Sequence, residues 1–141
     1  MSTTVNVQFT DEQMERLERE ARRLGKSPSE VAVRWVDEAL RQSKHPYIEF
    51  REAYLGRDAF LRGTRLKIWL LANHVRANDG NVARTAEQLE VPEAMVANAM
   101  KYAAEYATEI DAAIAENHAV ADEMRTMMPN ASAFQINASH S

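Results

Sequence analysis

The chain has 141 residues, an ordinary apolar fraction of 45% and a formal net charge of -4. This length allows one domain or two small ones, and the mild acidity excludes a chain-wide basic field that would draw the protein to nucleic acid. Cysteine is absent, which excludes disulfides and thiolate metal sites. There is no basic stretch followed by an apolar run at the start and no run as long as a membrane span, so we expect a soluble, cytoplasmic protein that does not enter a membrane.

An alternating segment at residues 4–9 opens the first predicted unit, residues 1–43. Alternation of apolar and polar residues is the period of a half-buried strand. Its apolar face is formed by Val5, Val7 and Phe9, and its polar face by Thr4, Asn6 and Gln8. Because one short strand cannot pair with itself, we expect it to pair with the same strand of a second copy. Such a two-fold ribbon fits the major groove of DNA.

Two helices are predicted after this strand. Thr10 and Gln13 form a capping-box pattern, and an apolar stripe then runs to Gly25, which suits the left-handed end of a helix. Ser27 and Glu30 start a second helix in the same way. The resulting strand–helix–helix unit is too small to bury a stable core alone, so we expect it to fold as a dimer.

This pattern, which spans residues 3–42, resembles the ribbon-helix-helix family of repressors and antitoxins. The resemblance implies an intertwined β-α-α dimer that binds operator DNA. It implies base contacts from the outward residues of the strand, Thr4, Asn6 and Gln8. It also implies a phosphate contact at the start of the second helix, from Lys26, Ser27 and Ser29; the free N–H groups of a helix N-terminus favour an anion there. The strand has no Arg or Lys, so a ribbon that serves only for dimerisation remains the alternative.

The second predicted unit covers residues 45–118. His45-Pro46 marks its start, and we expect extended segments near residues 47–51 and 56–66 with a glycine turn. A strongly apolar helix follows from Leu66 to about residue 78, and Asn81 caps a shorter helix. One long helix is expected from Pro92 onwards, with the carboxylates at Glu105, Glu109, Asp111 and Glu116 on its solvated side. The two short helices have helix-turn-helix proportions.

Several motifs in residues 46–117 resemble a small bacterial helix-turn-helix family of unassigned role that occurs in antitoxins encoded beside PIN-like toxins. The resemblance rests on His45-Pro46-Tyr47-Ile48, Gly63-Thr64-Arg65-Leu66 and the run from Ala99 to Tyr102. It implies a compact helical domain. The polar residues of the expected recognition segment are Glu93, Asn98 and Lys101, and the region is net acidic. A helical scaffold that packs on itself or on a partner is therefore favoured over DNA reading, and Arg65 fits a structural ion pair as well as a functional role.

The predicted tail, residues 119–141, changes character. A helical extension is broken at Pro129-Asn130, and apolar residues without a helical stripe follow. Apolar side chains on such a segment suit a partner groove. From the resemblance to antitoxins, we expect the toxin-binding residues to be Met124, Arg125, Met127, Met128, Phe134 and Ile136, with Arg125 approaching the acidic site of a PIN-type toxin. A frayed terminus is the alternative.

No catalytic, metal or cofactor site is expected. The histidines, His45, His74, His118 and His140, are scattered, and no nucleophile elbow, phosphate loop or dinucleotide fingerprint occurs. The chain as a whole is expected to be mainly α: a ribbon-helix-helix unit, a helix-turn-helix-like domain and a tail. The leading hypothesis is a type II antitoxin that neutralises a PIN-domain ribonuclease and represses its own operon. The alternatives are a stand-alone repressor and a structural oligomerisation protein without DNA binding.

Overall fold

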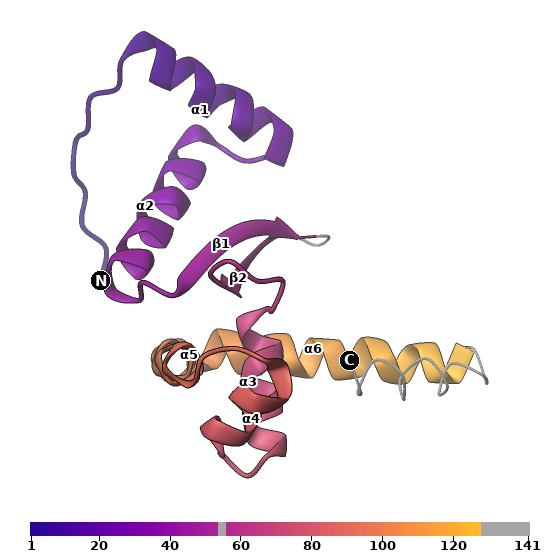
Figure 1. Ribbon diagram of the computed structural model, residues 1–141. Helices are drawn as coiled ribbons and strands as arrows, with labels where there is room; N and C mark the ends of the chain where they lie inside the picture. The colour runs from indigo at the N-terminus through magenta and orange to yellow at the C-terminus, as the bar shows by residue number, and fades with distance from the viewer. Residues whose placement is uncertain (54–55, 128–141) are drawn as a thin grey trace. The chain divides into compact units, whose positions relative to one another are not determined.

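The computed structural model describes residues 1–53 and 56–127, with side chains described up to residue 119. It confirms a mainly helical chain and divides it into two compact units, Met1–Lys44 and His45–Ser141. The first unit contains α1 (Asp11–Leu24) and α2 (Pro28–Lys44). The elements of the second are β1 (Ile48–Ala53), β2 (Gly56–Leu61), α3 (Ile68–Ala77), α4 (Val82–Leu89), α5 (Glu93–Glu105) and α6 (Ala107–Met127). Figure 1 shows both units in the colours of the chain.

The predicted β-α-α order is wrong for the single chain. Residues 1–10 have no regular secondary structure, and the strands of the described chain lie after two helices, at β1 and β2. A strand is defined by hydrogen bonds to a neighbouring strand. Within the described part of the first unit, residues 4–9 have no strand beside them, so the alternating pattern has nothing to pair with.

The two helices of the first unit are bounded by the residues that the sequence predicted. The Thr10 hydroxyl oxygen accepts a hydrogen bond from the Gln13 N–H at 3.1 Å, and the Gln13 side chain accepts one from the Thr10 N–H at 2.9 Å. Gly25 ends α1 with a left-handed φ of 65°, which costs glycine no steric strain. The chain thereby reverses into α2, which packs against α1 (Figure 1).

The second unit begins with an antiparallel hairpin. The register pairs Ile48 with Leu61 and Ala53 with Gly56, so the predicted extended segments are confirmed. After the Asn78–Gly80 turn, Asn81 caps α4 by accepting a hydrogen bond from the Arg84 N–H at 2.9 Å. The helix boundaries near residues 78 and 81 are therefore also as predicted.

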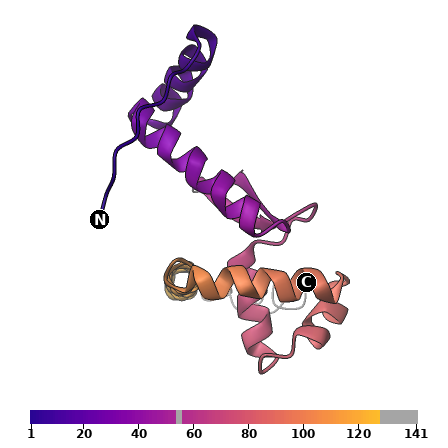
Figure 2. The ribbon, with the colours of Figure 1, turned by 90° about the vertical axis from the view of Figure 1, so that its left-hand side faces the viewer.

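The predicted long helix from Pro92 is in fact two helices. Tyr106, with φ -111° and ψ 38°, separates α5 from α6. The two helices lie at a steep angle, since each is seen end-on in the view that shows the other lengthwise (Figures 1 and 2). The bend lets both helices pack on α3. A sequence pattern with apolar residues at helical spacing on both sides of the bend cannot reveal it, because the spacing is preserved through Tyr106.

The two units differ greatly in core size. The first buries Leu17, Ala21 and Val31. In the second, hairpin and helices share one apolar cluster, formed by Ile48, Ala59, Leu61, Ile68, Leu71, Ala72, Val75, Ala86, Val96, Ala99, Tyr102, Ala103, Ile110 and Ile114. No helix among the described residues is both long and apolar enough to cross a membrane.

Candidate functional site

The predicted base-contact residues lie on the exposed segment before α1. Thr4, Asn6 and Gln8 are all exposed. The apolar residues between them are exposed as well, by 80% at Val5 and 63% at Val7. The alternation therefore presents two open faces at Val5 and Val7 in the single chain, whereas Phe9, which is 46% exposed, lies beside residues of α1 and α2.

The start of α2, where a phosphate contact is predicted, holds its own carboxylate. The Ser27 hydroxyl oxygen accepts a hydrogen bond from the Glu30 N–H at 3.1 Å, and the Glu30 carboxylate accepts one from the Ser27 N–H at 3.3 Å. The hydrogen bonds from the Ser27 backbone N–H and hydroxyl lower the pKa of Glu30, and the charge of Lys26 acts in the same direction. A DNA phosphate arriving at this helix end would meet a negative charge already in place.

Lys26 and Ser29, both exposed, line an open hollow of about 570 Å³ beside this helix end. The other lining residues are Glu30, Val33, Arg34 and Asp37. Arg34 is a cation that the sequence prediction missed. Its spacing of four residues from Glu30 places both on one face of α2, and this spacing was the available signal.

The first unit also has an exposed apolar surface, in contrast to the charged residues at the start of α2. Val33, Val36 and Leu40, which follow one another at helical spacing on α2, are 69%, 59% and 65% exposed. Next to them, a groove of about 300 Å³ separates α1 from α2. It is lined by Phe9, Gln13, Arg16, Leu17, Ala32, Trp35 and Val36. Exposed aliphatic and aromatic side chains in such number are unusual for a unit that buries three core residues.

The second unit contains a pair of ionisable side chains in which the histidine is buried and the carboxylate is exposed. His45 is 8% exposed, and its Nε2 lies 2.6 Å from Glu105 Oε2. The imidazole ring also meets the edge of Tyr102 with the ring centroids 5.2 Å apart. Asp111, in turn, accepts a hydrogen bond from Arg76 at 2.6 Å. Glu105 and Asp111 are exposed, as expected for the solvated side of a helix, but each also contacts a side chain from another part of the unit.

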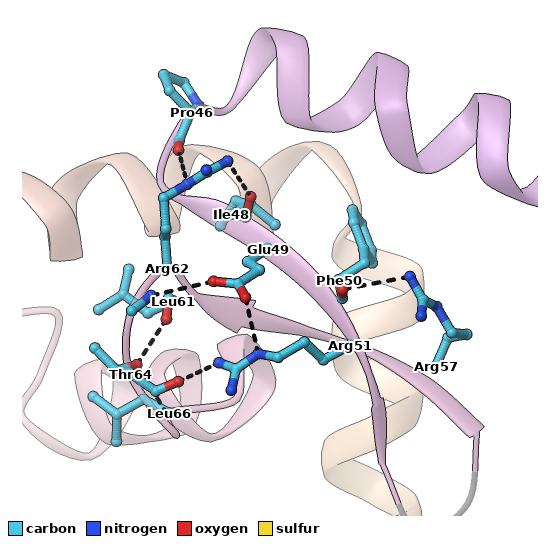
Figure 3. A network of polar contacts seen from close by, with 11 residues as sticks. Pro46, Ile48, Glu49, Phe50, Arg51, Arg57, Leu61, Arg62, Thr64 and Leu66 are labelled. Atoms are coloured by element: carbon cyan, nitrogen blue, oxygen red, sulfur yellow. Dashed lines mark hydrogen bonds and ion pairs between the residues drawn. The ribbon is translucent and has the colours of Figure 1, made fainter.

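Figure 3 shows a network of polar contacts around the loop that joins β2 to α3. Arg51 donates to the Thr64 carbonyl oxygen, and Glu49 accepts from the Gly63 N–H at 3.2 Å. The Thr64 hydroxyl donates to the Leu61 carbonyl oxygen at 2.8 Å and accepts from an amide further along the loop. The Gly-Thr-Arg motif thus lies in a loop whose backbone is held from both sides.

The expected recognition segment lies in α5. Glu93 and Lys101 are exposed, whereas Asn98 is half-buried and donates to the Ala94 carbonyl oxygen at 2.7 Å. Residues 68–119 contain three Lys or Arg against eight Asp or Glu. An acidic surface of this kind opposes the phosphate backbone of DNA, so the geometry adds nothing in favour of DNA reading by α5.

The predicted toxin-binding residues cannot be placed. Met124, Arg125 and Met127 belong to α6, but their side chains lie outside the described residues. Met128, Phe134 and Ile136 lie outside the described residues altogether. Helix α6 runs from the second predicted unit through residue 118 into the predicted tail, where the sequence predicted a helical extension.

In the described part of the chain, no group of three or more His, Cys, Asp or Glu residues could hold a metal ion. No family model, curated protein or solved structure matches the chain.

Proposed function

We propose that the chain is the antitoxin of a type II toxin–antitoxin pair. Two copies pair through residues 4–9 as a ribbon, in an intertwined dimer, and this ribbon binds operator DNA and represses the operon. The same protein binds a PIN-domain ribonuclease directly and neutralises it. The proposal draws its family assignment from the resemblance of the alternating segment, the two capped helices and the Gly-Thr-Arg loop to antitoxin modules.

One observation carries the dimeric part of the proposal: the first unit exposes more large apolar side chains than it buries. Val5, Val7 and Phe9 precede α1, and α2 adds the exposed residues Val33, Trp35, Val36 and Leu40. Removing apolar surface from water contributes about 25 cal/mol per Å². A second copy is the economical cover, because it supplies both a strand for residues 4–9 and an identical apolar face for α2.

Paired in this way, the ribbon turns its two faces in opposite directions. Val5, Val7 and Phe9 face the helices, and the polar residues Thr4, Asn6 and Gln8 face outwards. Short amide and hydroxyl side chains are suited to hydrogen bonding with base edges in the major groove. The hollow at the start of α2 adds Lys26 and Arg34, whose charges are balanced by Glu30 and Asp37 in the same hollow.

Two measurements test this proposal. Co-expression of the chain with the ribonuclease encoded by the neighbouring gene should give a stable complex in which cleavage of RNA is suppressed. The promoter region of the same operon should bind the chain in preference to scrambled DNA. Recovery of no complex and equal affinity for both DNAs would together remove the proposal.

A second candidate function has a specific observation in its favour. The absence of Arg and Lys from residues 4–9 and the carboxylate of Glu30 at the start of α2 both weaken attraction to phosphate. The first unit would then serve for oligomerisation alone. This candidate predicts no DNA binding even at low salt, where phosphate contacts are strongest.

A further inference from the structure

The loop between β2 and α3, residues 62–67, is held by hydrogen bonds to the hairpin and within the loop itself. The Arg62 N–H donates to the Tyr47 carbonyl oxygen at 2.7 Å, and the Thr64 N–H donates to the Leu61 carbonyl oxygen at 3.0 Å. The loop closes on itself through the Leu61 N–H, which donates to the Leu66 carbonyl oxygen at 2.8 Å. Together with the contacts from Glu49 and Arg51, these bonds fix the loop backbone on the hairpin (Figure 3).

The other cations of this region are committed to partners within the unit. Arg51 lies 3.3 Å from a carboxylate oxygen of Glu49 and over the ring of Phe60. Lys67 lies 3.7 Å from Asp58. The side chain of Arg62 donates to the Pro46 carbonyl oxygen at 2.7 Å. Each of these charges therefore has a local role in holding the hairpin or the loop.

Arg65 is different. It is exposed, and within the part of the chain that the structure describes its side chain has no hydrogen bond, ion pair or ring contact. The residues before and after it, Thr64 and Leu66, both form hydrogen bonds within the unit. Because the loop backbone is already fixed, binding through Arg65 has to order its side chain alone, which is the arrangement expected of a recognition residue.

The charge distribution indicates what the guanidinium binds. Residues 45–67 contain five Lys or Arg against three Asp or Glu, whereas residues 68–119 contain three against eight. A nucleic-acid backbone needs several uncommitted cations along its path, and the hairpin offers one beside strongly acidic helices. A single planar guanidinium instead matches a single carboxylate, which it binds through two parallel hydrogen bonds.

We propose that Arg65 is a recognition residue for a protein partner and forms a bidentate ion pair with a carboxylate on the partner's surface. The partner is the ribonuclease of the proposed function, on which this inference rests. The Gly-Thr-Arg loop then acts as a docking point in the second unit, separate from residues 119–141 and from the DNA-binding ribbon.

The test measures the affinity of the full-length chain for the ribonuclease encoded beside it. Arg65→Gln should weaken the complex about tenfold or more, because it leaves the partner's carboxylate without its ion pair. The affinity of Arg65→Lys should lie between those of the wild type and Arg65→Gln, since an ammonium group keeps the charge but lacks the planar geometry of the guanidinium group. Arg84→Gln is the matched control: it removes the same charge from another exposed site in the same unit, whose side chain also has no contact among the described residues, and should leave the affinity unchanged.

The possible outcomes distinguish failure of the Arg65 docking contact from failure of the proposed function. If the wild-type chain binds the ribonuclease and Arg65→Gln binds equally well, the inference is overturned while the proposed function stands. An equal loss in Arg65→Gln and Arg84→Gln would show a diffuse charge effect and also overturn it. Weaker binding of Arg65→Gln to operator DNA, with unchanged ribonuclease binding, would assign the loop to nucleic acid instead. If the wild-type chain binds no ribonuclease, both the inference and the proposed function fail.

Discussion

The two units of this chain differ in how much of their apolar surface they bury within a single copy. The second unit folds a hairpin and four helices around a cluster of fourteen buried apolar residues, and among its described side chains the exposed large apolar residue is Tyr47, at 36%. The first unit buries three and leaves Val5, Val7 and Val33 more than 60% exposed. Helix caps and turns can therefore form fully in a unit that buries only a few apolar residues. Local signals specify the elements of the first unit, and the proposed dimer would supply the surface that its small core lacks.

The largest expected effect comes from charging the exposed apolar face of α2. Val36→Asp should weaken dimerisation at least a thousandfold, about 4 kcal/mol, because the carboxylate would be buried without a partner in the dimer. The hairpin and helices of the second unit should remain folded. Light scattering over a range of protein concentrations measures the mass, and Glu87→Asp, on an exposed face of α4, controls for general effects. If the Val36→Asp dimer is as stable as the wild-type dimer, the exposed apolar face of α2 does not form the dimer interface.

The second prediction concerns the larger core and shortens one of its buried side chains. Leu71→Ala should destabilise the second unit by about 3 kcal/mol, since it leaves a cavity among fully buried side chains. Because this core is contained within one chain, the midpoint of its unfolding should not depend on protein concentration. Chemical denaturation followed by tryptophan fluorescence at two concentrations gives both quantities; Trp69 packs against this core. A concentration-dependent midpoint for the second unit would contradict its self-sufficiency.

A smaller effect is expected from the polar face of residues 4–9. Asn6→Ala should weaken specific operator binding about tenfold, since one amide contact to a base edge contributes roughly 1–3 kcal/mol. The mass of the dimer should not change, because Asn6 lies on the face opposite Val5 and Val7. Titrations with operator DNA and with scrambled DNA measure the difference in affinity that is specific to the operator sequence. Equal affinities of wild type and variant for the operator would assign the ribbon to dimerisation alone.

The smallest effect concerns the cap at the start of α2. The pKa of Glu30 is lowered from 4.5 in the folded chain by its hydrogen bonds with Ser27. The unfolded chain therefore takes up this proton first as the pH falls, so the cap's contribution to stability is present above pH 4.5 and is lost as the pH falls through the lower folded pKa. Glu30→Gln should flatten the dependence of stability on pH in this acid range. Thermal unfolding of wild type and variant between neutral pH and pH 3 should converge at the acid end, and parallel curves would contradict the cap's role.

Much of the local structure could be predicted from the sequence. The caps at Thr10 and Asn81 and the left-handed Gly25 depend on neighbouring residues alone, and each lies where it was expected. The hairpin and the turn before Asn81 were accessible for the same reason. Short-range chemistry determines these features, and short-range patterns reveal them.

The remaining features depend on contacts between distant residues. The bend at Tyr106 exists because α5 and α6 both pack on α3, and the partner of Glu105 is sixty residues away at His45. The pairing of residues 4–9 depends on a strand that the described chain does not supply. Of the candidate site, the sequence identified the exposed polar residues Thr4, Asn6 and Gln8 and the capping pair Ser27 and Glu30 at the start of α2. It could not reveal that Arg65 has no side-chain partner among the described residues.

The central claim, that two copies complete the first unit through residues 4–9, is tested most directly by amide hydrogen exchange at those residues. At high protein concentration, where scattering gives twice the chain mass of 16.0 kDa, the amides of a paired ribbon should be protected from exchange, and the protection should disappear with the dimer on dilution. Rapid, unprotected exchange of residues 4–9 in a protein whose α1 and α2 amides are protected would contradict the claim.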